Sequence, residues 1–201
     1  MYHDYIAEYI KPGSSVLDMG CGRGVLAGKL VEKGCRVLGV ELDADKLKEA
    51  GRLSVDTICS DLDKEEVWRE IRGKFDYVIF VDVLEHLKSP WVALALARKL
   101  LNDGGEVIAH IPNVSYWSTR LTLLSGEFEY DSKGGIFDSE HLRFFNYYTM
   151  RRMFEGCGYG IKEMKPWIYS SLERELCRIP FFKWSFLNLF AKSFTSILKA
   201  G

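Results

Sequence analysis

The sequence predicts an α/β fold in which helices cover both faces of a mostly parallel sheet. Short apolar strands alternate with helical stretches over more than half of the chain, and strand–helix–strand units place their strands in parallel. At 201 residues, the chain is long enough to bury the core of one domain without disulfides or a metal. A glycine-rich turn, Gly20-Cys21-Gly22-Arg23-Gly24, follows the first strand. Such turns bind ligands at the carboxyl ends of parallel strands.

The first half of the chain alternates regularly between helical and extended patterns. A lead-in helix ends at Lys11-Pro12-Gly13-Ser14, because proline and glycine interrupt helical backbone. Gly34 ends the next helix, and Asp63-x-x-Glu66 has the spacing of a capping box that opens a later one. The expected elements are the helix 2–10, the strand 15–19, the helix 25–32, the strand 35–40, the helix 45–53, the strand 55–59, the helix 63–71 and the strand 75–81.

The second half continues this order and then interrupts it. Ser89-Pro90 indicates an N-cap followed by proline at the first helical position, and Thr149 indicates another N-cap. Residues 113–148 are too long for an ordinary connection, so we expect a substrate-side insertion or lid there. The remaining expected elements are the helix 90–101, the strand 106–111, the helix 115–124, a helix from 149 to Cys157-Gly158, and the strands 160–167 and 194–198.

The segment 179–194 is rich in Phe, Trp and Leu, with lysines interspersed. We expect a helix that packs on the sheet between the last two strands, since such a helix needs an amphipathic pattern. The same pattern also suits a membrane surface, so weak peripheral association is an alternative.

Composition limits the possible partners and compartments. The net charge of −1 combines mixed signs, which argues against nucleic acid and favours a small-molecule partner. The five cysteines are scattered without a Cys-x-x-Cys pair, so neither a zinc site nor a disulfide framework is expected. The sequence shows no leader and no apolar run of about 18 residues. We therefore expect a cytoplasmic protein without stable membrane insertion.

The glycine turn and three acids form a candidate cofactor site. Val25 stands where a dinucleotide fingerprint has its third glycine, although a tight turn without a ligand also uses glycines. Glu41 lies at a strand end about 20 residues beyond the turn, where a carboxylate binds ribose hydroxyls or is simply solvated; Asp43 is the fallback. Asp18 either holds the turn or provides a counter-charge. Asp61 suits an adenine amino group or caps a helix.

Several motifs together resemble class I S-adenosylmethionine-dependent methyltransferases, over about Ser15 to Leu198. Residues 16–24 look like the first motif of that family, and residues 75–87 are similar to the fourth-strand motif of quinone-biosynthesis O-methyltransferases. Residues 111–117 and 140–145 resemble bacterial members associated with methionine or cell-surface polysaccharide biosynthesis. The resemblance implies a single Rossmann-like domain, 1–201, with a seven-stranded sheet whose seventh strand is antiparallel.

The resemblance also implies S-adenosylmethionine as cofactor and S-adenosylhomocysteine as product. In this reading Glu41 binds the ribose, and Ser60-Asp61-Leu62 forms the adenine edge. The implied cofactor-binding residues are Asp18, Gly20, Cys21, Gly22, Gly24, Glu41, Leu42, Asp61, Leu62 and Val81.

Histidines are the candidate bases for an acceptor hydroxyl, because their pKa suits proton transfer near neutral pH. In a helical turn, His86 shares one face with Asp82 and Glu85. This group resembles the acid-x-x-Glu-His element of metal-assisted O-methyltransferases, but Asp82 replaces their usual Glu, so no metal is predicted. His141 lies with Arg143 in the long insertion, and His110 suits either the site or the core. The predicted catalytic residues are His86, His141 and Asp82.

Residues near the insertion suggest the shape of the acceptor pocket. Asn113, Tyr116, Trp117 and Tyr130 could line it, although such aromatic residues also serve as core or lid packing. The fourth strand does not lead into the Asn-Pro-Pro-Tyr or Asp-Pro-Pro-Tyr sequence that similar enzymes use for nucleobase amines. The hypothesis is therefore methyl transfer to the hydroxyl of a small acceptor such as a sugar, quinone precursor or lipid-linked intermediate. The alternatives are a nicotinamide-dependent oxidoreductase and a non-catalytic cofactor-binding module.

Overall fold

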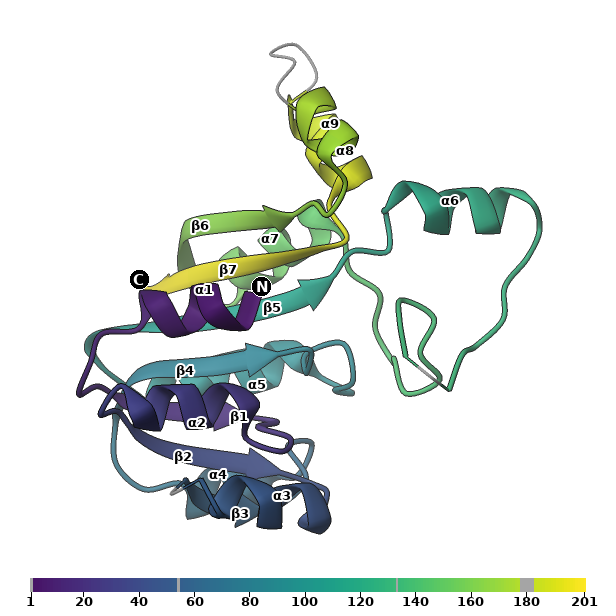
Figure 1. Ribbon diagram of the computed structural model, residues 1–201. Helices are drawn as coiled ribbons and strands as arrows, with labels where there is room; N and C mark the ends of the chain where they lie inside the picture. Colours follow the sequence, from purple (N-terminus) through teal and green to yellow (C-terminus); the bar gives the residue numbers. More distant parts are fainter. Residues whose placement is uncertain (1, 54, 133, 178–182) are drawn as a thin grey trace.

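The computed structural model, which describes residues 2–53, 55–132, 134–177 and 183–201, contains a seven-stranded sheet in the order β3-β2-β1-β4-β5-β7-β6 (Figure 1). Strands β1 to β5 pair in parallel, and β7 runs antiparallel to both β5 and β6. The predicted Rossmann-like sheet is confirmed. Its strands are β1 (Ser15–Met19), β2 (Arg36–Glu41), β3 (Asp56–Cys59), β4 (Phe75–Val81), β5 (Leu101–Pro112), β6 (Tyr159–Trp167) and β7 (Ser193–Ala200).

Helices cover both faces of the sheet, as predicted. Ile6 and Leu30 pack on one face, against Ile79, while Phe154 packs with Leu17 on the other face. Each strand therefore alternates its side chains between two buried layers. The helices are α1 (Tyr2–Tyr9), α2 (Val25–Glu32), α3 (Ala44–Gly51), α4 (Glu65–Glu70), α5 (Pro90–Lys99), α6 (Trp117–Leu124), α7 (Tyr147–Gly156), α8 (Ser171–Leu176) and α9 (Lys183–Phe190).

Two predicted helix caps are wrong. The Asp63 carboxylate accepts the Lys88 N–H at 3.0 Å, and α4 begins two residues later. Asn146 is the N-cap of α7, because its side chain accepts the N–H of Thr149 at 3.0 Å. Thr149 is instead the third helical residue, and its hydroxyl completes the capping box. In both cases the helix begins within a few residues of the predicted cap, so the order of elements is as predicted.

The segments outside the sheet differ more from expectation. Helix α6 and the loop after it stand apart from the sheet, and α8 and α9 project beyond it together (Figure 1). The end of the insertion returns to the core, where Phe145 and Tyr147 are buried. The expected helix across the sheet is therefore wrong for α9, although Ala191 and Phe194 after it are buried in the core; 178–182 lie outside the described residues. Among the helices that the structure describes, none has the length and apolar character to span a bilayer.

Candidate functional site

Two cavities meet at the carboxyl ends of the parallel strands. One, of about 220 Å³, lies beside the glycine turn and is lined by Asp18, Gly22 and Val81. The other, of about 610 Å³, lies between the ends of β4 and β5 and the insertion. Tyr2 and Asp82 line both cavities. This edge of the sheet is where α/β folds bind their ligands.

Gly20, Gly22 and Gly24 differ in how much space a side chain would have at each position of the turn. Gly20, at φ 74°, has no room for a side chain, because a Cβ there would lie 2.5 Å from Val83 Cγ2. Gly24, at φ 81°, packs against α3, and a Cβ would lie 2.9 Å from Ala50 Cα. A Cβ on Gly22 would meet nothing within 4 Å. Gly20 and Gly24 therefore shape the turn, and Gly22 leaves open space beside the small cavity.

Glu41 ties the end of β2 to this turn. Its Oε2 accepts the Gly22 N–H at 2.9 Å, and its Oε1 accepts the N–H groups of Leu42 and Asp43 at 2.9 and 3.0 Å. The carboxylate is therefore oriented before any ligand arrives. Asp43, the predicted fallback, caps α3 by accepting the N–H groups of Asp45 and Lys46.

Asp18 is buried at the edge of the small cavity, with 3% of its surface exposed. Burial, reinforced by the charge of Glu41, raises the pKa of Asp18 to about 7. Among the described residues, no hydrogen bond involves its carboxyl group, so Asp18 does not hold the turn through backbone N–H groups. Asp18 lines the small cavity, and its other predicted role, a counter-charge for the cofactor, stays a prediction.

The predicted adenine edge lies away from both cavities. Asp61 Oδ1 accepts the Asp63 N–H at 2.9 Å, and the Leu62 carbonyl accepts the Trp68 indole N–H at 3.1 Å. Leu42 is 66% exposed at the end of β2. Several predicted cofactor ligands line neither cavity, so their roles in cofactor binding stay predictions; they include Glu41, Leu42, Asp61 and Leu62.

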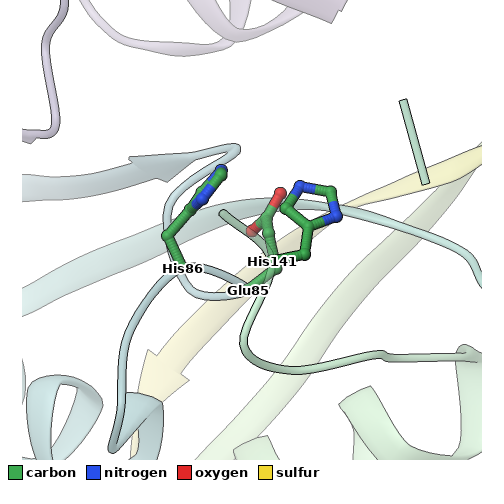
Figure 2. A group of neighbouring side chains, drawn as sticks. All are labelled: Glu85, His86 and His141. Atoms are coloured by element: carbon green, nitrogen blue, oxygen red, sulfur yellow. The ribbon is translucent and has the colours of Figure 1, made fainter. Parts of the chain in front are cut away.

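The larger cavity contains a cluster of one acid and two histidines. Glu85, His86 and His141 each offer a ligand atom, and these atoms lie within 4.8 Å of one another; Figure 2 shows the side chains converging. The insertion reaches Glu85 through backbone hydrogen bonds, since the N–H groups of Leu142 and Arg143 both donate to its carbonyl at 2.9 Å. Residues 56 positions apart, 85 and 141, are thereby brought together.

Both histidines are held in a defined tautomer. His86 Nδ1 lies 3.1 Å from the Glu140 carbonyl oxygen, and His141 Nδ1 lies 3.0 Å from the Ile136 carbonyl oxygen. A carbonyl can only accept, so each Nδ1 carries a proton, and in the neutral ring Nε2 keeps the lone pair. Backbone carbonyls orient metal-binding histidines in the same way.

Glu85 is the group that the cluster leaves unsatisfied. Its side chain is 1% exposed, and neither carboxyl oxygen has a hydrogen-bond partner among the described residues. Burial raises the pKa of Glu85 well above its ordinary value. A carboxylate and two imidazole nitrogens together suit a divalent cation, which would satisfy the buried acid. Sequence reasoning predicted no metal here, and that prediction stays untested.

Asp82 does not join His86 as predicted. Residues 82–88 form turns rather than a helix, and Asp82 has the left-handed φ of 52°. Its Oδ2 accepts the Tyr2 hydroxyl at 3.0 Å, and its Oδ1 lies 3.8 Å from His110 Nε2. The predicted helical face shared by Asp82, Glu85 and His86 is therefore wrong, because Asp82 has a left-handed backbone conformation and bends and turns follow it.

His110 is buried and satisfied within the fold. Its Nδ1 lies 2.8 Å from Thr195 Oγ1, and its ring stacks on Tyr2 at 3.9 Å. Burial lowers the pKa of His110 to about 3, so the ring is neutral near neutral pH. Sequence reasoning missed Tyr2, which the helical pattern assigned only to packing.

Two of the four residues suggested for the acceptor pocket line the cavity, namely Asn113 and Tyr116. The side-chain amide of Asn113 donates to the Asn188 and Ala191 carbonyls at 2.8 and 2.7 Å, so it joins α9 to the end of β5. Trp117 and Tyr130 do not line the cavity, and Tyr130 packs on Phe128 in the insertion.

Comparisons with known proteins agree with this architecture. A crystal structure of a SAM-dependent methyltransferase from Archaeoglobus fulgidus matches with a TM-score of 0.72 and 20% identity, over 98% of this chain and 90% of that one. Magnesium protoporphyrin IX methyltransferase from Synechocystis, solved with bound SAH, matches with a TM-score of 0.69 and 18% identity, over 100% and 82% of the two chains. The fold is that of the class I methyltransferases.

Sequence comparisons identify the family. The family model described as a methyltransferase domain matches residues 2–163, and the chain belongs to this family. The chain is 28% identical over 133 residues to the ubiquinone biosynthesis O-methyltransferase of Erwinia tasmaniensis. The alignment covers 62% of this chain and 54% of that protein. The ubiquinone biosynthesis O-methyltransferase of Chromobacterium violaceum is 27% identical over 170 residues, which are 81% of this chain and 71% of that protein. The chain spans about half the length of several such relatives.

Proposed function

We propose that this chain is an S-adenosylmethionine-dependent methyltransferase that methylates a hydroxyl oxygen of a small molecule. The observation that carries the proposal is the meeting of two cavities at Tyr2 and Asp82, one beside a glycine turn and one around an acid–histidine cluster. The relatives named as ubiquinone O-methyltransferases support oxygen as the acceptor atom. Family membership and Val25, in place of a third glycine, argue against a nicotinamide cofactor.

On the cofactor side, S-adenosylmethionine supplies an electrophilic methyl group. Gly22 leaves room for the cofactor beside the main chain, and Glu41 is oriented to accept ribose hydroxyls. Asp18 faces the small cavity as the counter-charge for the amino group of the methionine portion. Gly20, Cys21, Gly24 and Val81 shape the wall, whereas Leu42, Asp61 and Leu62 are proposed for the adenine end.

On the acceptor side, Glu85, His86 and His141 hold a divalent cation in this proposal. Such a cation supplies Lewis acidity that lowers the pKa of a bound hydroxyl. The two Nε2 lone pairs and the unpartnered carboxyl of Glu85 are the donor atoms. The insertion 113–148 acts as the lid that excludes water and aligns the acceptor with the methyl group. A cytoplasmic location and a small-molecule partner complete the proposal.

Calorimetric titration tests the cofactor assignment. We expect S-adenosylhomocysteine to bind and NAD to give no heat. Binding of NAD without S-adenosylhomocysteine would replace the proposal with the oxidoreductase alternative.

Methyl transfer and cation binding test the acceptor side. Labelled S-adenosylmethionine is incubated with hydroxylated sugars, catechols and quinone precursors, with EDTA or with Mg²⁺, Mn²⁺ or Zn²⁺. We expect transfer to a hydroxyl compound that EDTA abolishes and a cation restores, together with calorimetric binding of the cation alone. Methyl transfer that persists in EDTA would exclude the cation from the proposal. Cofactor binding without transfer to any acceptor would favour a non-catalytic module.

A further inference from the structure

Lys192 lines the larger cavity just before β7, two strands along the sheet from β4, which leads to Glu85. Its backbone is fixed where β7 begins, because its N–H donates to the Trp167 carbonyl at 3.0 Å and its carbonyl accepts the Asn113 N–H at 2.8 Å. The ammonium group lies over the rings of Tyr116 and Tyr169, at 5.4 and 5.5 Å from their centroids. All of these side chains except Trp167 line the cavity. Two cation–π contacts thus restrict a flexible side chain.

The charge of Lys192 is left without an acidic partner. Among the described residues, no carboxylate pairs with it, and it is the single lysine or arginine that lines this cavity. Glu173, which is buried nearby, accepts instead from the Tyr116 hydroxyl and the Trp117 indole N–H at 2.9 and 2.7 Å. Lys192 is exposed, so its ammonium group has hydrogen-bond donors that an anionic ligand group in the cavity can accept from.

A second group in the same cavity supports an anion. Thr119 is 4% exposed and lines the cavity from the first turn of α6, and its hydroxyl has no hydrogen-bond partner among the described residues. Tyr116 provides no side-chain cap for α6, so the first N–H groups of the helix also lack a side-chain acceptor there. The Thr119 hydroxyl is therefore available to donate a hydrogen bond to a ligand oxygen in the cavity.

We propose that Lys192 and Thr119 bind a carboxylate of the methyl acceptor, which makes the acceptor a hydroxylated organic acid. This inference rests on the proposed methyl transfer and names the substrate class of the same site. The order β4-β5-β7 separates Lys192 from the strand that leads to Glu85 by two strand spacings, roughly 10 Å. One molecule can therefore place its carboxylate at Lys192 and its hydroxyl at the cluster. A monoanion matches the single charge of Lys192, since Asp82, Glu85 and Asp138 line the rest of the cavity.

The test compares two probes that differ by one carboxylate. Catechol and 3,4-dihydroxybenzoate are titrated into the S-adenosylhomocysteine complex of the wild type and of four variants, without turnover. We expect the wild type to bind 3,4-dihydroxybenzoate roughly 10- to 100-fold more tightly than catechol. Lys192→Met brings this ratio close to one, Lys192→Arg keeps most of it, and Thr119→Val lowers it a few-fold. Lys199→Met, an exposed lysine farther along β7, is the matched control and keeps the wild-type ratio.

Equal affinities for the two probes in the wild type, or an unchanged ratio in Lys192→Met, would overturn the carboxylate subsite. Tighter binding of 3,4-dihydroxyphenyl phosphate than of 3,4-dihydroxybenzoate would overturn the choice of a carboxylate. Because binding is measured without turnover, a carboxylate preference without methyl transfer counts against the proposed function alone. Equal kcat/KM values for both probes would count against the subsite and leave the function intact. Circular dichroism of each variant confirms folding.

Discussion

The two cavities differ in how far the chain satisfies its own polar groups. Beside the glycine turn, both oxygens of Glu41 already accept backbone N–H groups. In the larger cavity, Glu85 has two oxygens without partners among the described residues, and Lys192 has no carboxylate beside it. The backbone thus orients the acid beside the glycine turn, although the carboxyl group of Asp18 in the small cavity makes no hydrogen bond among the described residues. The larger cavity has more polar groups that only a ligand would satisfy. Preorganisation thus marks the side that binds a common cofactor, and unsatisfied groups mark the side that selects a particular acceptor.

The largest effect is expected from a variant of the larger cavity, which weakens cation binding and leaves cofactor binding intact. Glu85→Gln removes the one anionic donor of the cluster, so we expect cation affinity and methyl transfer to fall by roughly 100-fold or more. Affinity for S-adenosylhomocysteine stays the same. Calorimetry and initial rates measure the two effects, with Glu140→Gln, an exposed acid next to His141 in the sequence, as the control. Unchanged cation affinity in Glu85→Gln would contradict the cluster.

The second largest effect is expected on cofactor binding, from variants of Glu41 beside the glycine turn. Glu41→Ala lowers affinity for S-adenosylhomocysteine by roughly 10- to 100-fold, because it removes charge-assisted hydrogen bonds, and it leaves cation binding unchanged. Glu41→Gln keeps part of the backbone contacts and loses less. The control is Asp45→Ala, whose carboxylate pairs with Lys48 at 2.8 Å on the surface of α3. An affinity equal to that of the wild type would exclude Glu41 as a ribose ligand.

A pH dependence sharpens the role of Asp18. Its pKa of about 7 means that binding a cationic amino group requires loss of a proton below neutral pH, so S-adenosylmethionine affinity rises by roughly tenfold from pH 6 to pH 8. Asp18→Asn removes this part of the pH dependence, as measured by calorimetry at each pH. The same slope in both proteins would show that another group titrates.

The pH dependence of stability checks the pKa of Asp18 independently, because stability falls with rising pH whereas cofactor affinity rises. The pKa of Asp18 is raised from 3.8 on folding, so the folded protein binds the proton more tightly than the unfolded chain. The free energy of unfolding therefore falls as pH rises from about 4 to about 7, and Asp18→Asn flattens that fall. Urea unfolding at several pH values measures it.

The smallest effect concerns the wall shared by the cavities. Tyr2→Phe keeps the ring stacked on His110 and removes the hydrogen bond to Asp82, so we expect kcat/KM to fall roughly 3- to 10-fold. Tyr5→Phe is the matched control in α1, since its hydroxyl donates to Glu163 at 2.9 Å. An equal loss in both variants would assign the effect to the stability of α1.

Local chemistry explains what the sequence could predict. The strands β1 and β4 and the helix α2 have the predicted bounds, because apolar runs and glycines define them within a few residues. The cofactor side was predictable for the same reason, as its turn and Glu41 follow neighbouring strands. On the acceptor side, the sequence named His86 and His141, but it could not show that the fold of the insertion brings them to Glu85. Asp82 was misplaced because its left-handed backbone conformation excludes a helical turn there, which residue spacing cannot reveal.

The wall formed by Tyr2 and Asp82 has a thermodynamic consequence. Ligands in the two cavities contact opposite sides of the same pair of side chains. Any shift of that pair that one ligand favours changes the free energy of binding the other. By linkage, the factor by which an acceptor alters cofactor affinity equals the factor by which the cofactor alters acceptor affinity. The hydrogen bond from the Tyr2 hydroxyl to Asp82 is thus one contact through which the two binding free energies can be coupled.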